Sequence, residues 1–303
     1  MTAGGHPPRR AGFVAVVGRT NVGKSTLVNG IVGEKVAIVT PKPQTTRNVL
    51  RGIFTEARGQ IVFLDTPGLH KPRTRMNRTM VKAALESVEG VDAVLWVLDA
   101  TALWKEEEER LAERLGAAGR PVVLALNQMD RLRRREEALP LMARLAGRFP
   151  GWPVYPLSAL APGDFPGLLD LLFPLLPEGE PLFPPDLYTD QMERQLAAEI
   201  VREHVFARTR QEVPHCTGVL VESFEEPRAE GGKVVIRCAV LVERESQKPI
   251  LIGRGGQTLK AIGTAARAEL KRVLGCPVEL RLFVKVRPDW REDAQLLKQM
   301  GLA

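Results

Sequence analysis

The stretch Gly18-Arg19-Thr20-Asn21-Val22-Gly23-Lys24-Ser25 decides the fold of this chain. It fits the pattern GxxxxGK[ST], follows an apolar run at 12–17 and opens a helical pattern at 25–33. Glycines in such a loop let backbone N–H groups approach phosphate oxygens, and the lysine supplies charge to the β- and γ-phosphates. The hydroxyl of Ser25 is suited to Mg²⁺. We therefore expect a P-loop, continued by Thr26, that binds the phosphates of a nucleotide.

Apolar runs alternate with helical patterns through the first half of the chain. The runs lie at 12–17, 60–64, 93–98, 121–126 and 153–157, with helical patterns at 25–33, 77–89, 105–116 and 133–149. Short apolar runs separated by amphipathic helices predict a mostly parallel sheet wrapped by helices. We expect an α/β domain over residues 1–178, with its ligand site at the carboxyl ends of the strands.

The composition changes where five prolines fall within the thirteen residues 173–185. Such a segment is typical of a stiff linker, which we place at 179–188. The pattern beyond it predicts a smaller α+β domain over residues 189–303. Its elements are a helix at 189–211, strands at 217–224 and 233–243, two helices around a glycine-rich turn at 247–274, a strand at 277–286 and a last helix at 289–300.

Length and composition fit this two-domain scheme. The chain has 303 residues, 44% of them apolar and 26% charged, which excludes a disordered or collagen-like chain. Its net charge of +7 is weak evidence for an anionic partner such as nucleic acid. The three cysteines form no CxxC pair, so we expect no metal knuckle and a reducing cytosol. We expect no signal peptide and no membrane span.

Three further motifs stand at strand ends. Asp65-Thr66-Pro67-Gly68 would hold Mg²⁺ through the aspartate, usually by way of water, and approach the γ-phosphate with the Gly68 N–H. Asn127-Gln128-Met129-Asp130 offers a carboxylate that accepts from guanine N1–H and N2–H₂, a donor pair that adenine lacks. Ser158-Ala159-Leu160 would bring a backbone N–H to guanine O6.

These four motifs, in this order, resemble those of the translation-factor-like GTPases. The whole chain is similar to the Era family, GTPases with a C-terminal KH domain, and the resemblance covers nearly all 303 residues. It implies GTP, GDP and Mg²⁺ as ligands. The stretch Pro43-Gln44-Thr45-Thr46-Arg47 is similar to the family's first switch, in which the threonine before arginine closes on Mg²⁺ and the γ-phosphate. We assign that role to Thr46, with Thr45 as the alternative.

The resemblance gives each site residue a role. Lys24, Thr46 and Gly68 are expected to take part in catalysis, and Ser25, Thr46 and Asp65 to hold the metal. The nucleotide site comprises Gly18, Arg19, Thr20, Asn21, Val22, Gly23, Lys24, Ser25, Thr26, Asp65, Gly68, Asn127, Gln128, Asp130, Ser158, Ala159 and Leu160.

Three positions bear on the strength of this site. The family pattern NKxD has lysine where this chain has Gln128, so nucleotide affinity is expected to fall while Asp130 preserves guanine preference. Leu69 follows the DxxG motif where many GTPases have a glutamine that positions water, which favours slow hydrolysis. Asn21 matches an asparagine that helps to hold K⁺ in potassium-activated relatives, so K⁺ is a further candidate ligand.

A basic module lies near the C-terminus. Residues 248–287 hold nine Lys and Arg against two Glu, so the rest of the chain sums to zero charge. Such concentration favours a phosphate backbone as partner. Within it, Ile252-Gly253-Arg254-Gly255-Gly256 sits between two helices and matches the I-G-x-x-G of type II KH domains, whose loop clamps single-stranded RNA. We add Lys260 to this expected RNA site.

Other residues of the chain have simpler interpretations. Ile250, Leu251, Leu259 and Ile262 would lie under splayed bases or, as we favour for most of them, in the core. The acidic run Glu106–Glu109 and the basic run Arg131–Arg135 are interpreted as solvated helix faces.

The family resemblance implies a GTP-hydrolysing switch that binds 16S rRNA near its 3′ end and assists assembly of the 30S subunit. It implies a cytoplasmic protein with a peripheral contact at the inner face of the cell membrane, and we expect a monomer that does not bind DNA. Two alternatives stay open. One is a constitutive RNA-binding assembly chaperone with a weakened nucleotide site, motivated by Gln128 and Leu69. The other is a membrane-surface GTPase regulator, although no basic amphipathic helix stands out to support it.

Overall fold

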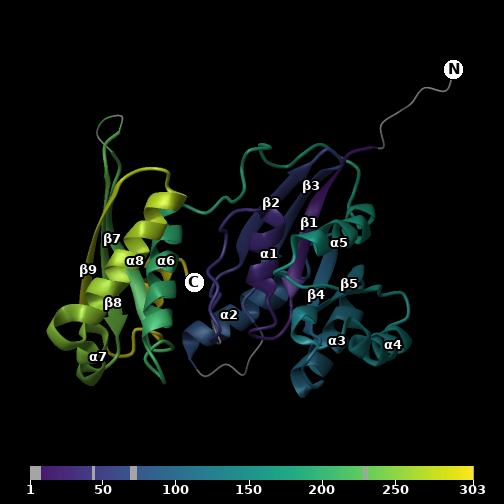
Figure 1. The fold of residues 1–303 in the computed structure, drawn as a ribbon, viewed down its shortest axis with the longest axis horizontal. Coiled ribbons are helices and arrows are strands. Elements are labelled where there is room, and N and C mark those ends of the chain that lie inside the picture. Colours follow the sequence, from purple (N-terminus) through teal and green to yellow (C-terminus); the bar gives the residue numbers. More distant parts are fainter. Residues whose placement is uncertain (1–7, 43–44, 69–73, 228, 230, 303) are drawn as a thin grey trace. The chain divides into compact units, whose positions relative to one another are not determined.

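The chain divides into two compact units in the computed structural model (Figure 1). The structure describes residues 8–42, 45–68, 74–227, 229 and 231–302. The first unit comprises Met1–Ala37, Thr46–Lys71 and Val81–Asp190, and the second comprises Ile38–Thr45, Pro72–Met80 and Gln191–Ala303. The division is therefore not continuous along the sequence, because two short segments from the first half of the chain belong to the second unit.

A six-stranded sheet forms the first unit, with strand order β2-β3-β1-β4-β5-β6. All neighbours are parallel except β2 and β3, which are antiparallel. The strands are β1 (Arg10–Val17), β2 (Leu50–Glu56), β3 (Gly59–Asp65), β4 (Ala93–Asp99), β5 (Val122–Asn127) and β6 (Val154–Pro156). The helices of this unit are α1 (Lys24–Val32), α3 (Glu106–Ala118), α4 (Leu139–Arg148) and α5 (Phe165–Leu172). Helix α2 (Arg75–Glu86) is divided at Met80, with its first half in the second unit and its second half in the first.

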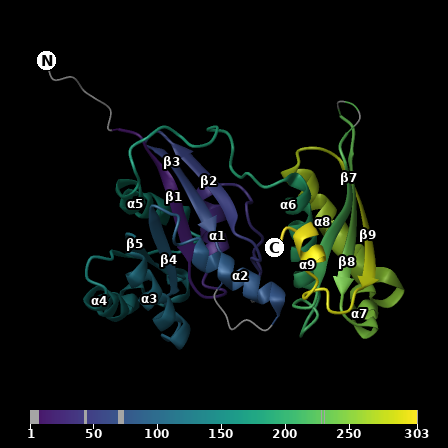
Figure 2. The same cartoon turned by 180° about the vertical axis from the view of Figure 1, so that it is seen from behind.

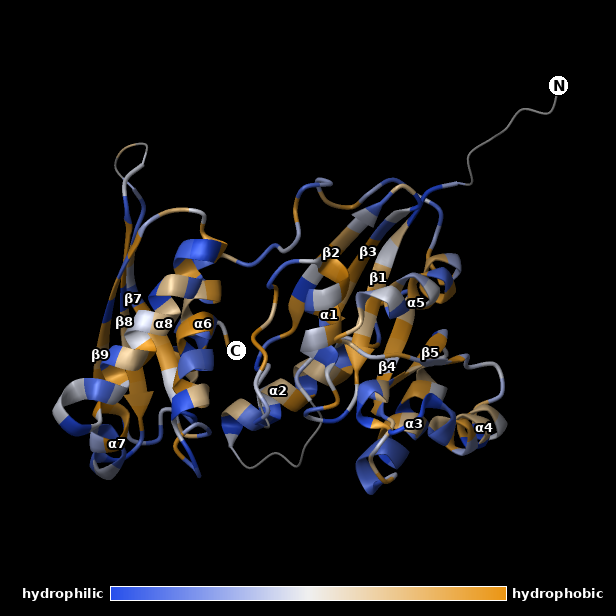
Figure 3. Cartoon of the chain, viewed as in Figure 1, coloured by the Kyte–Doolittle hydropathy of each residue, from blue (hydrophilic) through white to orange (hydrophobic). Residues whose placement is uncertain are grey.

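Side chains of the central strands point alternately to the two faces of this sheet, so each face has its own hydrophobic core. Leu95 and Val97 of β4 pack into one buried cluster, whereas Val94 and Trp96 pack into the other. Every side chain from Ala93 to Val97 is fully buried, and β4 is hydrophobic along its length in Figure 3. A strand buried on both faces is what a parallel sheet covered by helices requires. The predicted α/β domain is thus confirmed.

The sequence analysis did not predict two elements of the first unit, namely β2 and α5.

The proline-rich segment differs from a free linker, because it is bound along the edge of the sheet. The buried amide of Gln60 donates to the Phe183 carbonyl and accepts from the Leu182 and Phe183 N–H groups, each at 2.9 Å. Ile53 N–H donates to the Tyr188 carbonyl at 2.9 Å. The division of the units falls after Asp190.

The second unit has the predicted order of helices and strands (Figure 2). Its sheet runs β7-β8-β9, with β7 and β8 antiparallel and β8 and β9 parallel. Its elements are α6 (Glu193–Arg208), β7 (Gly218–Glu225), β8 (Val234–Val242), α7 (Lys248–Ile252), α8 (Gln257–Val273), β9 (Val278–Val286) and α9 (Ala294–Gln299). Helices α6 and α8 pack on one face of the sheet around Ile200, Ile236 and Ile262.

Among the described residues, no helix combines the length and the apolar character needed to cross a lipid bilayer.

Candidate functional site

The P-loop connects β1 to α1 and is held from two sides. Gly23 has a φ of 96°, and a Cβ there would lie 2.3 Å from Nδ2 of Asn127, so both the backbone angle and the space require glycine. The side chain of Lys24 is buried, and its ammonium donates to the carbonyls of Gly18 at 3.0 Å and Arg19 at 2.8 Å. Burial lowers the pKa of Lys24 to about 8, although the Asp65 charge opposes that shift. The loop therefore fixes a cation beside its own backbone.

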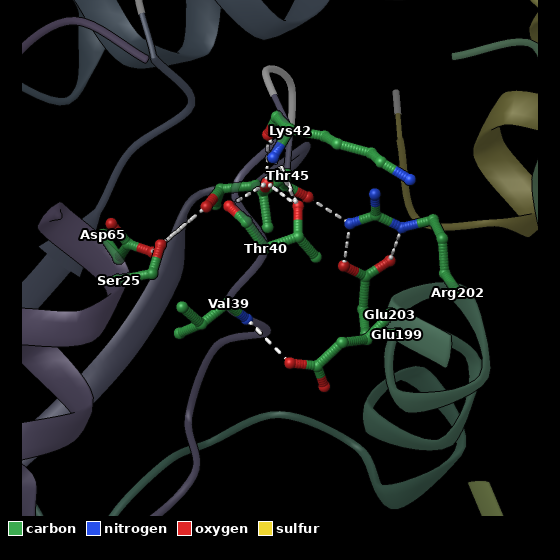
Figure 4. A network of polar contacts seen from close by, with 10 residues as sticks. Ser25, Val39, Thr40, Lys42, Thr45, Asp65, Glu199, Arg202 and Glu203 are labelled. Atoms are coloured by element: carbon green, nitrogen blue, oxygen red, sulfur yellow. Dashed lines mark hydrogen bonds and ion pairs between the residues drawn. The ribbon is translucent and has the colours of Figure 1, made fainter. Parts of the chain in front are cut away.

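The three predicted metal ligands come together. Ser25 Oγ donates to Asp65 Oδ2 at 2.6 Å and lies 2.8 Å from the hydroxyl of Thr46, which is 3.3 Å from the same carboxylate oxygen. Figure 4 shows Ser25 and Asp65 side by side. Three chain segments, namely the start of α1, the residues before β2 and the end of β3, thus meet at one cluster of oxygen atoms.

The Asp65 carboxylate suits a hard cation. It is fully buried, and burial raises its pKa, opposed by the Lys24 charge and by the Ser25 and Thr46 hydroxyls. Its Oδ1 atom has no hydrogen-bond partner among the described residues. A buried carboxylate oxygen without a partner is costly unless a cation or its water meets it. Two hydroxyls and a carboxylate are the oxygen ligands that Mg²⁺ accepts, and so these residues fit that ion.

The predicted guanine motifs also meet, and Asn127 joins them to the P-loop. Its Nδ2 donates to the Val22 carbonyl at 2.7 Å, and its Oδ1 accepts from Ala159 N–H at 2.8 Å. Ser158 Oγ donates to Asp130 Oδ1 at 2.5 Å, so the two loops after β5 and β6 are connected directly. One buried amide therefore fixes the spacing between the phosphate loop and the base-binding loops.

Two residues that support the site were missed. Glu108 lies in the acidic run that we interpreted as solvated, yet it is buried and pairs with the P-loop residue Arg19 at 2.9 Å. It also accepts from Lys105 N–H at 2.9 Å at the start of α3. Asp164 accepts from Ser158 N–H at 2.8 Å. The pair of Glu108 with Arg19 has no local signal, because the two residues are 89 positions apart, whereas the partner of Asp164 lies only six positions away.

The switch segments are described in part. Thr46 is placed as above, and Gly68 lies against the P-loop, since a Cβ on Gly68 would come within 2.8 Å of Thr20 Cα. Leu69, Pro43 and Gln44 lie outside the described residues.

The expected RNA loop has the geometry of a backbone clamp. Helix α7 ends at Ile252, and Gly253, Gly255 and Gly256 have φ of 73°, 54° and 78°, a conformation that favours glycine at all three. Arg254, Gly255 and Lys260 are exposed, and α8 begins at Gln257. An exposed glycine turn followed by a helix N-terminus presents N–H groups to phosphate.

The apolar residues near this loop divide into two groups. Leu251 and Ile262 are fully buried and belong to the core, as we favoured. Ile250 is 50% exposed, so it is not a core residue.

A segment from the first half of the chain is docked on α6 within the second unit. Arg202 is 1% exposed, and its guanidinium pairs with Glu199 and donates to the Thr45 carbonyl, as Figure 4 shows. Lys42 Nζ donates to the Phe206 and Thr209 carbonyls at the end of α6. A cation there satisfies carbonyls that the helix cannot pair and complements its dipole. The sequence analysis missed both cations.

Comparisons with known proteins match both halves of the chain. A family model for 50S ribosome-binding GTPases matches residues 13–128, and a KH-domain model matches residues 212–291. The GTPase Era of Geobacter metallireducens is 46% identical over 294 residues, 97% of this chain and 98% of the relative. This chain belongs to the Era family of GTPases.

Two solved Era structures resemble this family member along almost its whole length. Both are 40% identical to it and cover 97% of this chain and 99% of the other. One is an Aquifex aeolicus Era variant bound to GDP and AlF₄⁻, with a TM-score of 0.92. The other is Era in complex with MgGDPNP and nucleotides 1506–1542 of 16S ribosomal RNA, with a TM-score of 0.93.

The position of Asn127 yields a prediction for this Era-family GTPase. In Asn127→Ala, the Val22 carbonyl and the Ala159 N–H both lose a buried partner. Each loss costs about 1–3 kcal/mol, so we expect GDP affinity to fall by about 30-fold or more in a titration with a fluorescent GDP analogue. The exposed Glu136→Ala on the following loop is the control and keeps the original affinity. Unchanged binding by Asn127→Ala would contradict the role that we give to this amide.

Proposed function

We propose that this chain is a GTP-hydrolysing switch that binds single-stranded 16S rRNA near its 3′ end and assists assembly of the 30S subunit in the cytoplasm. Residues 1–178 would act as the GTPase module, 179–188 as the connection and 189–303 as the RNA module. One observation carries the proposal. The oxygen cluster of Ser25, Thr46 and Asp65 and the open Gly253–Gly256 loop occur in one chain. An Era structure of the same fold holds MgGDPNP and RNA together.

The nucleotide chemistry rests on the P-loop and the two switches. Ser25, Thr46 and Asp65 would hold Mg²⁺, which when bound neutralises charge on the phosphates. Lys24 would place its positive charge at the β- and γ-phosphates. Gly68 would bring a backbone N–H to the γ-phosphate and sense its loss. Asp130 would select guanine by accepting from its N1–H and N2–H₂ groups. Leu69 cannot orient water, so the chain would hydrolyse GTP slowly without a partner.

The RNA site would act mainly on the sugar-phosphate backbone. Glycine at 253, 255 and 256 allows a phosphate to approach the loop closely, while Arg254 and Lys260 add charge. The exposed side chain of Ile250 would contact a base. Such a clamp accepts about four nucleotides of single-stranded RNA, and its affinity depends on salt.

Coupling between the two modules would run through the first switch. Thr46 belongs to the first unit, and the residue before it, Thr45, belongs to the second. Thr45 is bound to α6 through Arg202, and Lys42 is bound to the end of the same helix. If GTP and Mg²⁺ order Thr46, that ordering reaches α6 across one peptide bond. This route would not pass through the proline-rich segment at 179–188.

The RNA assignment predicts the effect of reversing one charge. In Arg254→Glu, a carboxylate replaces the cation at the expected phosphate path, so affinity for an oligonucleotide from the 3′ end of 16S rRNA should fall by about tenfold or more. The salt slope should decrease by about 1. Arg267→Glu is the control, because it makes the same charge change at an exposed position farther along α8. Equal losses in the two variants would contradict a specific loop site.

The coupling route predicts the effect of removing Lys42. In Lys42→Ala, the segment before Thr46 loses two of its bonds to α6 and keeps the bond from Arg202 to Thr45, so RNA affinity should differ less between the GDP state and a state with a non-hydrolysable GTP analogue. We expect that ratio to fall by about threefold or more, within the usual range of coupling energies. GDP affinity should stay within about twofold of the original, because Lys42 makes no described contact with the nucleotide site. Lys298→Ala, an exposed lysine on α9, is the control. A ratio unchanged in Lys42→Ala would refute this route.

A further inference from the structure

Gln128 occupies the position where the NKxD pattern has lysine, and its surroundings differ from those of a weakened site. It follows β5 with a φ of 67°, a left-handed conformation that is uncommon outside glycine. Its Nε2 donates to the backbone carbonyl of the P-loop residue Asn21 at 3.0 Å. A bond from position 128 to the P-loop is therefore present with an amide as its donor.

The other end of the same amide is also used. The guanidinium of Arg131 donates to Gln128 Oε1 and lies 3.9 Å from Oδ2 of Asp99. Asp99 is itself fixed, because its Oδ1 accepts from the N–H of Thr101 at 2.8 Å and from the Thr101 hydroxyl at 2.7 Å. Asp99 ends β4 directly beside Asn127 at the end of β5. Arg131 thus connects the carboxylate at one strand end to the amide at the next.

This arrangement determines which way the Gln128 amide faces. A glutamine amide has one accepting oxygen and one donating nitrogen, and only the orientation with the oxygen toward Arg131 lets the nitrogen donate to Asn21. The guanidinium can only donate, so it excludes the flipped amide. Arg131 is therefore a positioning residue that acts on the P-loop through Gln128.

The positive charge of Arg131 also favours glutamine over lysine at position 128. A lysine at position 128 would carry an ammonium, which donates but cannot accept from Arg131. It would also place a second cation next to the guanidinium, and like charges at this range repel. Position 128 therefore accommodates glutamine because Arg131 already supplies the positive charge there.

We propose that Gln128 and Arg131 together replace the lysine of the NKxD pattern, with Gln128 bonding the P-loop and Arg131 supplying the cation that orients it. Guanine-nucleotide affinity is then preserved in this chain, contrary to the loss expected from the sequence. The inference rests on the nucleotide binding in the proposed function.

A double-mutant cycle on the full-length chain tests this proposal. Arg131→Ala, Gln128→Lys and the double variant are compared with the original chain for the dissociation constant and off-rate of a fluorescent GDP analogue with Mg²⁺. Steady-state GTP hydrolysis is measured on the same samples. Arg133→Ala, which removes an exposed charge two residues away, is the matched control.

If Gln128 and Arg131 act together, the effects of the two substitutions on GDP affinity do not add. Arg131→Ala weakens GDP binding by about three- to tenfold through a faster off-rate, and raises KM for GTP with little change in kcat. Gln128→Lys alone weakens binding or leaves it unchanged, because of the adjacent guanidinium. The double variant returns to within about twofold of the original chain, because lysine now bonds the P-loop without a neighbouring cation. Arg133→Ala binds as the original chain does.

Other outcomes overturn the inference in distinguishable ways. If Gln128→Lys alone tightens binding and Arg131→Ala has no effect, then glutamine at position 128 merely weakens the affinity for GDP, and Gln128 and Arg131 have no joint role. If the two effects add, Arg131 does not act through Gln128. If the original chain fails to bind the GDP analogue at all, the proposed function fails and this inference fails with it.

Discussion

The buried carboxylate of Asp65 is the constraint on which the rest of the structure depends. It lies at the end of a strand that is buried on both faces, with Lys24 and the hydroxyls of Ser25 and Thr46 around it. An unpaired buried charge is expensive, so the chain must bring donors and a cation to this point. The P-loop comes from β1, and Thr46 comes from the segment before β2. Three separate segments of the chain therefore meet at one carboxylate.

Thr46 also lies at the division between the two units. The residue before it is bound to Arg202 of α6, within the unit that carries the glycine loop. Arg202 is almost wholly buried and paired with Glu199, so its position is fixed by the core of that unit. A conformational change needs a segment with two arrangements and a contact that differs between them. In the proposed coupling, the peptide between Thr45 and Thr46 is that segment, whereas the proline-rich segment is bound along the first sheet through Gln60 and Ile53.

The sequence predicted the features that depend on local pattern. The P-loop, the aspartate at the end of β3, the loops after β5 and β6 and the glycine turn between α7 and α8 all have short-range signals in residue type and spacing. Strand β2 was missed because polar and charged residues interrupt its apolar pattern, and α5 because it begins with Phe165-Pro166-Gly167 close to the proline-rich segment. Glu108, Arg131 and Arg202 were missed for a different reason. Each is a charged helical or loop residue that would be solvated by default. Its role comes from a contact that residue type alone does not predict, with Arg19 for Glu108, Gln128 for Arg131 and Thr45 for Arg202.

The most direct test of this account is hydrogen exchange of the segment Ile38–Thr45, compared between the GDP state and the state with Mg²⁺ and a non-hydrolysable GTP analogue. Exchange reports local opening free energies segment by segment. The account predicts that the analogue slows exchange at Thr46, in the segment before it and at the end of α6, while β4 and β5 exchange equally in both states. Slower exchange confined to Thr46 and the P-loop, with Ile38–Thr45 and α6 unchanged, would contradict the claim that this peptide links the nucleotide to the RNA unit.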